Sequence, residues 1–336
     1  MENTKQLWFL GPESIETRVV SCPEPDAYSV RVRTHCSAVS AGTEMLVYRG
    51  ELPQDLALDA VLENMQESPT YPLQYGYASV GTIDAVGANV AKDMLGKRVF
   101  GFAPHASHFL SEPAGLIPIP DEVAFEDAAF LANMETAVNL AQDGQALIGE
   151  SVAVLGQGVV GLLLTGLLAR YPLSKLLCVD GIQARRERAQ ELGASAVFSP
   201  EQASAIEEKL GEQGADVIFE LSGSPQALNL AIDLSGYGSR IIIGSWYGSK
   251  SAAIALGGKA HRNRLQISTS QVSSIAPALS ARWTKARRFD VAWQMLLALK
   301  PSQWVDSRCG IDEAPALYKK IHKTPESITQ ALFTYE

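Results

Sequence analysis

Short apolar runs alternate with helix-like segments through the middle of the chain, from about residue 149 onward. Six of these runs are rich in β-branched residues and have the length of buried strands: 151–156, 175–180, 195–199, 216–223, 240–246 and 265–270. The segments between them have helical length, and one of them, 159–170, is apolar almost all round. Strands that alternate with helices predict an α/β domain with a doubly wound parallel sheet, covered by helices on both faces.

The two ends of the chain have a different pattern. Alternating or glycine-separated runs at 18–39, 77–87 and 97–102 predict short β-strands, and 124–142 has a helical pattern. Near the C-terminus, two amphipathic stretches precede a strand-like run at 329–336. The N-terminal part is therefore expected to be rich in β-structure.

The first strand of the alternating region runs into Gly156, Gly158 and Gly161, with the spacing G-x-G-x-x-G. In a dinucleotide-binding turn the first glycine makes the sharp turn, the second lets the backbone approach a diphosphate, and the third lets the helix pack closely. Val159 and Val160 begin that helix, whose amide groups would face the phosphates. An ordinary tight turn is the alternative for the glycines alone, but the flanking strand and helix favour dinucleotide binding.

Asp180 ends the second strand of this region, at about the 20-residue distance expected of a ribose-binding carboxylate. A carboxylate accepts hydrogen bonds from ribose hydroxyls and repels a 2′-phosphate, so the residue favours NAD over NADP. Arg185 favours the opposite choice, because an arginine near this position can hold a 2′-phosphate. A solvated helix face is the alternative interpretation of Arg185.

Two later turns complete the expected cofactor site. Ser222 and Gly223 end the fourth run, after DVIFEL, where we expect the turn to skirt the adenosine ribose and the nicotinamide. Gly244 and Ser245 lie at the carboxyl end of the fifth run, after RIII, where doubly wound sheets bind ligands. We expect this second turn near the nicotinamide ring.

Composition narrows the class of protein. A chain of 336 residues with 46% hydrophobic and 19% charged residues is typical of a globular protein of two domains. Its net charge of −9 disfavours nucleic acid and anionic membranes as partners. We find no apolar stretch of about 18 residues and no basic-then-apolar leader, so a cytoplasmic location is expected. The 4 cysteines are far apart and are expected to be reduced.

These features together resemble the medium-chain dehydrogenase/reductase superfamily of alcohol dehydrogenases. The resemblance rests on the β-rich N-terminal part, a helix that contains Thr136 and Ala137, the glycine motif and the C-terminal return, and it spans almost the whole chain. It implies a GroES-like catalytic domain at 1–132, completed by 275–336, and a Rossmann domain at 133–274. It also implies a homodimer that acts on a small-molecule substrate.

Zinc-binding members of that family carry three metal ligands that this chain lacks. Their cysteine falls here on Ser40 or Ala41, in AVSAGTE, and their histidine falls on Tyr77, in GYA. The third position falls near Ala132, and the lobe of four closely spaced cysteines is missing as well. Because a catalytic zinc needs three Cys, His or carboxylate ligands, we predict that this chain binds no metal.

Without a metal, a side chain must exchange a proton with the substrate oxygen as the hydride moves. The resemblance indicates Tyr77 at the former histidine position, Thr43 at the position of a proton-relay hydroxyl, and Glu44 beside it. Glu135, at the start of a helix, is the fourth candidate. The alternatives are that Tyr77 fills vacated volume, that Thr43 caps a turn, and that either glutamate pairs with an arginine such as Arg49.

The segments SAVSAGTEMLVYRGELP, YPLQYGYASVG and NMETAVN most resemble the zinc-lacking branch that contains hydroxyethyl bacteriochlorophyllide dehydrogenases. This branch implies a secondary alcohol or ketone on a bulky, ring-bearing substrate. Two alternatives are an NADPH-dependent quinone or enone reductase, which Asp180 disfavours, and a catalytically silent nucleotide-binding protein. The acidic segment 50–71 is either a lid that excludes water or a surface connection.

Overall fold

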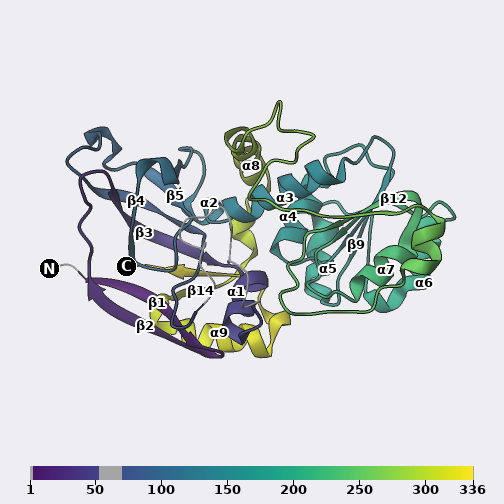
Figure 1. The fold of residues 1–336 in the computed structure, drawn as a ribbon, viewed down its shortest axis with the longest axis horizontal. Helices are drawn as coiled ribbons and strands as arrows, with labels where there is room; N and C mark the ends of the chain where they lie inside the picture. The colour runs from purple at the N-terminus through teal and green to yellow at the C-terminus, as the bar shows by residue number, and fades with distance from the viewer. Residues whose placement is uncertain (1–2, 53–69, 336) are drawn as a thin grey trace. The chain divides into compact units, whose positions relative to one another are not determined.

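The structure is a computed structural model that describes residues 3–52 and 70–335. The chain divides into two compact units, Met1–Ala132 with Leu296–Glu336, and Asn133–Met295. The predicted fold class is confirmed, since one unit holds a parallel sheet with helices and the other a separate β-rich sheet (Figure 1). Most of the expected lid lies outside the described residues.

The second unit contains a six-stranded sheet in which all the strand pairs are parallel. The strand order is β10-β9-β8-β11-β12-β13. This is the doubly wound arrangement: β8, the first of these strands in the sequence, lies inside the sheet, and later strands are added first on one side of it and then on the other. The strands are β8 (Ser151–Leu155), β9 (Lys175–Val179), β10 (Ala196–Phe198), β11 (Ala215–Glu220), β12 (Ser235–Ile243) and β13 (Gln266–Thr269). All six strands predicted from the apolar runs are present.

Helices connect these strands and cover the sheet because the central strands are apolar on both faces (Figure 1). The connecting helices are α4 (Val159–Leu168), α5 (Gln183–Glu191), α6 (Ala203–Leu210) and α7 (Ala227–Leu234), while α3 (Leu131–Gly144) precedes β8 and α8 (Lys285–Leu299) follows β13. Helix α4, apolar almost all round in the sequence, is buried along most of its length. Its burial agrees with the rule that a helix without a polar face lies inside a protein.

The first unit contains a seven-stranded sheet and a two-stranded hairpin. The hairpin is β1 (Asn3–Gly11) with β2 (Ser14–Ser21), and the sheet is formed by β3 (Val30–Val39), β4 (Ser79–Val86), β5 (Arg98–Gly101), β6 (His108–Ser111), β7 (Leu116–Pro118), β14 (Val305–Gly310) and β15 (Gln330–Thr334). Strand β15 pairs with β3, so the C-terminal return predicted from the sequence completes the N-terminal sheet.

Among its described residues, the first unit contains the α-helices α1 (Ala41–Arg49), α2 (Phe125–Ala128) and α9 (Ala314–Lys323). Helices α1 and α9 pack with the sheet around one apolar cluster, in which Phe9 and Tyr318 meet edge to face at 5.5 Å. Phe333 of β15 is fully buried in the same cluster. The core of this unit therefore joins residues from both ends of the chain.

The division between the units differs from the expected one at its C-terminal side. The second unit continues to Met295, whereas the resemblance implied an end at residue 274. The reason is local packing: the buried Arg288 side chain, in α8, bonds to Glu135 and Asn139 of α3. These contacts hold the start of α8 against the second unit.

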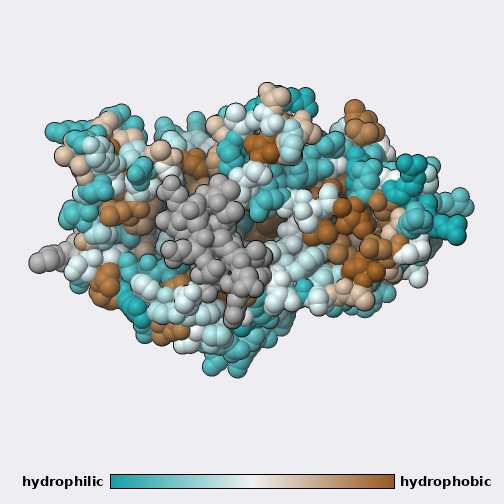
Figure 2. All heavy atoms as spheres, in the orientation of Figure 1, coloured by the Kyte–Doolittle hydropathy of each residue, from teal (hydrophilic) through white to brown (hydrophobic). Residues whose placement is uncertain are grey.

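The surface of the described residues is mixed. On the face shown in Figure 2, hydrophilic residues alternate with hydrophobic ones, and the broadest gathering of hydrophobic residues lies over the second unit. Within residues 3–52 and 70–335, every helix is too short or too polar to cross a membrane.

Candidate functional site

The glycine turn follows β8 directly, and its three glycines have different surroundings. Gly156 has φ of +97°, and a Cβ there would lie 2.5 Å from the backbone of Leu221. A Cβ on Gly161 would lie 2.0 Å from the carbonyl oxygen of Gly156, so α4 begins in close contact with the turn. Nothing lies within 4 Å of the Cβ position of Gly158, which precedes the first residues of α4, Val159 and Val160. The fold requires the outer two glycines, whereas Gly158 leaves open space at the helix N-terminus.

Asp180 lies against this turn. Its Oδ2 accepts a hydrogen bond from the backbone N–H of Gln157 at 2.6 Å, and its Oδ1 accepts one from Ile182 at 2.8 Å. A carboxylate has about four acceptor positions, so these two bonds leave capacity for ribose hydroxyls. Arg186 donates to the carbonyl oxygen of Asp180 at 2.7 Å, while Arg185 lies half-buried in α5. The carboxylate is thus placed beside the turn by the turn's own backbone.

A buried glutamate joins the two later turns. Glu220 ends β11 and is fully buried, and its carboxylate accepts hydrogen bonds from the N–H and hydroxyl of Ser222 and from the Tyr247 phenol. The Ser245 hydroxyl accepts a bond from the Gly223 N–H at 2.9 Å. The turns that follow β11 and β12, including Gly244, are therefore connected. We did not identify Glu220 from the sequence, although an acidic residue at the end of an apolar strand was a usable signal.

In the first unit, Tyr77 is half-buried and lies beside the N-terminus of α1. Its phenol donates a hydrogen bond to the Ser40 hydroxyl, and it also bonds with the Thr43 side chain. Burial raises the pKa of Tyr77 above its ordinary value, and the nearby Glu44 carboxylate acts in the same direction, while the two hydroxyl partners oppose the rise. Tyr77 is therefore a neutral phenol, able to donate a proton, through the physiological pH range.

Glu44 is fully buried and its oxygens are occupied. Oε1 accepts the backbone N–H of Ser40 at 2.7 Å, and Oε2 accepts the Tyr318 phenol and lies 3.1 Å from Nε2 of His105. Glu44 does not pair with Arg49, whose carboxylate contact is Glu51 at 3.8 Å. Glu44 therefore holds the first turn of α1 in place, next to Ser40, whose hydroxyl accepts the hydrogen bond from Tyr77.

The same network has the order of a serine–histidine–carboxylate triad. Ser37 Oγ lies 2.6 Å from Nδ1 of His105, whose Nε2 faces Glu44. All three side chains are fully buried, and Ser37 Oγ also bonds with the Tyr335 phenol at 2.7 Å. A nucleophile must reach its substrate, so this triad is part of the core and does not indicate hydrolysis.

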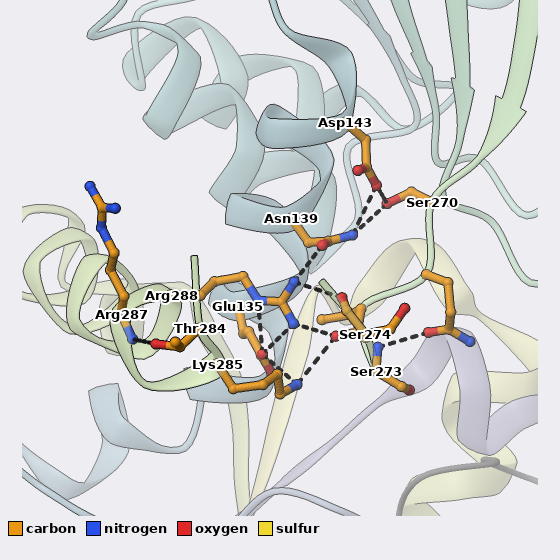
Figure 3. Close-up of polar contacts among 12 residues, drawn as sticks. Glu135, Asn139, Asp143, Ser270, Ser273, Ser274, Thr284, Lys285, Arg287 and Arg288 are labelled. Carbon is orange, nitrogen blue, oxygen red and sulfur yellow. Dashed lines mark hydrogen bonds and ion pairs between the residues drawn. The ribbon is translucent and has the colours of Figure 1, made fainter. Parts of the chain in front are cut away.

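Glu135 lies in the second unit among cations. Its Oε1 accepts two hydrogen bonds from Arg288, at 2.8 and 3.0 Å, and lies 2.6 Å from Nζ of Lys285 (Figure 3). Arg288 is fully buried. The alternative noted for Glu135, pairing with an arginine, is thus what the structure contains.

The side chains at the three former metal-ligand positions do not fit zinc. They supply a serine hydroxyl at Ser40, a phenol at Tyr77 and a methyl group at Ala132, and zinc sites use thiolate, imidazole or carboxylate ligands. Glu44 and His105 are bonded to each other in the core. Within the described part of the chain, no three His, Cys, Asp or Glu side chains are grouped as a metal site would need. The absence of a metal stays a prediction.

Comparisons with known proteins bear on the same question. A family model described as "Zinc-binding dehydrogenase" matches residues 159–289, which excludes all three former ligand positions. The D-guloside 3-dehydrogenase of Escherichia coli (strain K12) is 26% identical over 286 residues, which cover 81% of this chain and 82% of that protein.

Solved structures have the same fold. The 2R,3R-butanediol dehydrogenase from Bacillus subtilis superposes with a TM-score of 0.81 at 19% identity, over 99% of this chain and 100% of its own. An alcohol dehydrogenase from E. coli CFT073, in complex with NADH, gives a TM-score of 0.81 at 20% identity over the whole of both chains. In sequence the chain is similar to dehydrogenases over most of its length, and its fold is that of these solved dehydrogenase structures.

The different surroundings of the glycines give a test of their roles. Gly158→Ala should leave the thermal unfolding temperature unchanged, because its Cβ enters open space, but should weaken NADH binding by about tenfold or more, since the methyl group occupies the approach of the diphosphate. Gly161→Ala should lower the unfolding temperature, because its Cβ meets a backbone carbonyl. Calorimetry and NADH fluorescence titration measure both. Equal effects of the two substitutions on stability would contradict this assignment.

Proposed function

We propose that this chain is a zinc-independent oxidoreductase that transfers a hydride between NAD(H) and a secondary alcohol or its ketone. The observation that carries the proposal is the glycine turn at the end of β8, with the Asp180 carboxylate held against it by the Gln157 N–H. When bound, the nicotinamide supplies or accepts the hydride. We further propose that Asp180 accepts hydrogen bonds from a ribose hydroxyl, which selects NAD over NADP.

We propose that the Tyr77 phenol exchanges the proton with the substrate oxygen. As a ketone is reduced, the substrate carbon gains the hydride and its oxygen gains the phenolic proton. The Ser40 and Thr43 hydroxyls, which bond to the phenol, orient it and stabilise the phenolate until the proton is replaced from water. In alcohol oxidation the phenolate, which forms only at alkaline pH, accepts the proton.

Of the four catalytic candidates, we propose that Glu44 and Glu135 act as positioning residues. Glu44 binds the Ser40 N–H and so fixes the first turn of α1 beside Tyr77. Glu135 neutralises Arg288. Neither carboxylate has the solvent access that a proton carrier needs, since Glu44 is fully buried and Glu135 is 2% exposed.

A ring-bearing substrate is the finer part of the proposal. The relative named D-guloside 3-dehydrogenase acts on a guloside, and this supports a ring-bearing secondary alcohol for the present chain. The named substrate itself does not transfer, because function lives in the particular site and not in the fold. We also propose a homodimer in the cytoplasm, which size-exclusion chromatography with light scattering and cell fractionation would test.

The cofactor assignment has a direct test. NADH should bind more tightly than NADPH by at least about tenfold, or 1.4 kcal/mol, because Asp180 repels a 2′-phosphate. Asp180→Asn, which keeps the shape and one acceptor oxygen, should reduce this preference. Fluorescence titration with both cofactors measures it. A tenfold preference for NADPH would favour the quinone or enone reductase, and NADH binding without turnover of alcohols, ketones or enones would favour the silent nucleotide-binding protein.

Zinc independence is tested by metal analysis of the purified protein. We expect well under one equivalent of zinc per chain and no loss of activity after dialysis against a chelator, because no ligand set for zinc was found among the described residues. One tightly held equivalent of zinc, with activity lost on its removal, would overturn the mechanism proposed for Tyr77.

Tyr77→Phe should lower kcat for ketone reduction by about 10²–10⁴-fold, the usual contribution of a positioned proton donor, with NADH binding unchanged. In the wild type the rate should stay level as pH rises and decline only above about pH 10, because burial raises the pKa of Tyr77 above its ordinary value. Tyr71→Phe, which removes a phenol bonded to the Val47 carbonyl, is the control and should retain the activity. A wild-type reduction rate that falls at neutral pH would exclude Tyr77 as the donor.

A further inference from the structure

A second buried network lies in the unit that contains the glycine turn (Figure 3). At its centre is Arg288, the largest fully buried side chain among the described residues. Its Nε and Nη2 donate to Glu135, and its Nη1 donates to the side-chain oxygen of Asn139. The guanidinium also donates to two backbone carbonyls, those of Val272 and Ser274, the latter at 3.1 Å.

These last two bonds hold the segment 270–274, which follows the edge strand β13. A second anchor acts at the start of the segment: the Ser270 hydroxyl donates to Asp143 at 2.7 Å and accepts from Asn139 at 2.8 Å. Lys285 adds a bond to the Val272 carbonyl at 3.2 Å. Side chains of α3 and α8 therefore fix this segment at both ends.

The segment lies at the carboxyl end of the parallel sheet. The Ser270 N–H donates to the carbonyl oxygen of Ile243 at 2.8 Å, so the segment begins beside the end of β12 and the turn of Gly244 and Ser245. Doubly wound sheets bind their ligands along this edge. The glycine turn at the end of β8 occupies the same edge, and β12 and β13 are the strands on the side away from Asp180. A dinucleotide with its adenosine at Asp180 would extend its other end toward them.

Stability alone does not account for the network. A buried ion pair costs much of its attraction in desolvation, and apolar side chains of similar volume would join α3 to α8 at least as well. A planar guanidinium with five donors, in contrast, fixes geometry, because it bonds a carboxylate and several carbonyls in set directions. Here those carbonyls belong to the segment at the ligand-binding edge.

We propose that Arg288 is a positioning residue for the cofactor, and that Glu135 is its counter-ion. The guanidinium holds 270–274 in the shape that receives the nicotinamide end of the dinucleotide. This inference rests on the proposed function, because it takes NAD(H) as the ligand. It assigns Glu135 a role that needs no proton transfer.

The test compares two ligands that differ only at that end. ADP-ribose shares the adenosine, diphosphate and second ribose of NADH but lacks the nicotinamide. Arg288→Lys keeps the charge and loses the fork of donors, and should weaken NADH binding by about tenfold, the order of effect of a displaced positioning contact, while ADP-ribose affinity is retained. Titration calorimetry with both ligands measures the difference.

The neighbouring Arg287 provides the matched control. It is exposed on the same helix, its side chain points away from the network, and its guanidinium lies over the Trp283 ring (Figure 3). Arg287→Lys should leave both affinities unchanged. Ser270→Ala removes one anchor and leaves the Arg288–Glu135 ion pair intact, so it keeps the test informative if Arg288→Lys fails to fold; it should weaken NADH binding by a smaller factor and spare ADP-ribose.

The outcomes separate the inference from the proposed function. Selective loss of NADH affinity in Arg288→Lys or Ser270→Ala supports the positioning role. Equal losses for both ligands, or no loss for either, overturn it while leaving the NAD-dependent function in place. A wild-type protein that binds neither NADH nor ADP-ribose overturns the proposed function, and the positioning role with it.

Discussion

Glu44, Glu135 and Glu220 are almost fully removed from water, and each carboxylate must find hydrogen-bond donors in the protein, because an unpaired buried charge costs several kcal/mol. In this chain the donors lie on the segments that would carry the chemistry. Glu44 accepts a hydrogen bond from the backbone at the start of α1, and Glu220 accepts one from the turn after β11. Glu135 accepts hydrogen bonds from Arg288, which in turn bonds to the segment after β13. Burial of these groups thereby shapes the candidate site.

This arrangement explains how short turns can be held in one fixed backbone conformation. The turns after β8, β11, β12 and β13 all leave the same edge of the sheet, where connecting segments are otherwise free to move. The Asp180 carboxylate binds the backbone of the glycine turn, and the Ser245 hydroxyl binds the backbone of the turn before it in sequence. A cofactor that binds here would meet backbone groups already held in position, so less ordering is required on binding.

The sequence predicted the part of the site that depends on local geometry. Gly156 and Gly161 are needed wherever a strand turns sharply into a closely packed helix, and that need is visible in a single short motif. The partners of Glu44 and Glu135 were not visible, since Tyr318 and Arg288 lie 274 and 153 residues away along the chain. Both glutamates were therefore catalytic candidates in the sequence analysis, with pairing to an arginine as the alternative, and Glu220 and His105 were not identified at all.

By itself, the sequence determined the α/β class, the six strands of the parallel sheet and the glycine turn, because periodicity and short motifs are local properties of the chain. Only the tertiary structure decided that residues 275–295 belong to the second unit and that hydrogen-bond donors surround Glu44 and Glu135. It also decided that the Tyr77 phenol bonds to the Ser40 hydroxyl at the start of α1. The physical reason is that burial and pairing of polar groups depend on which distant segments pack together, and no local pattern records that.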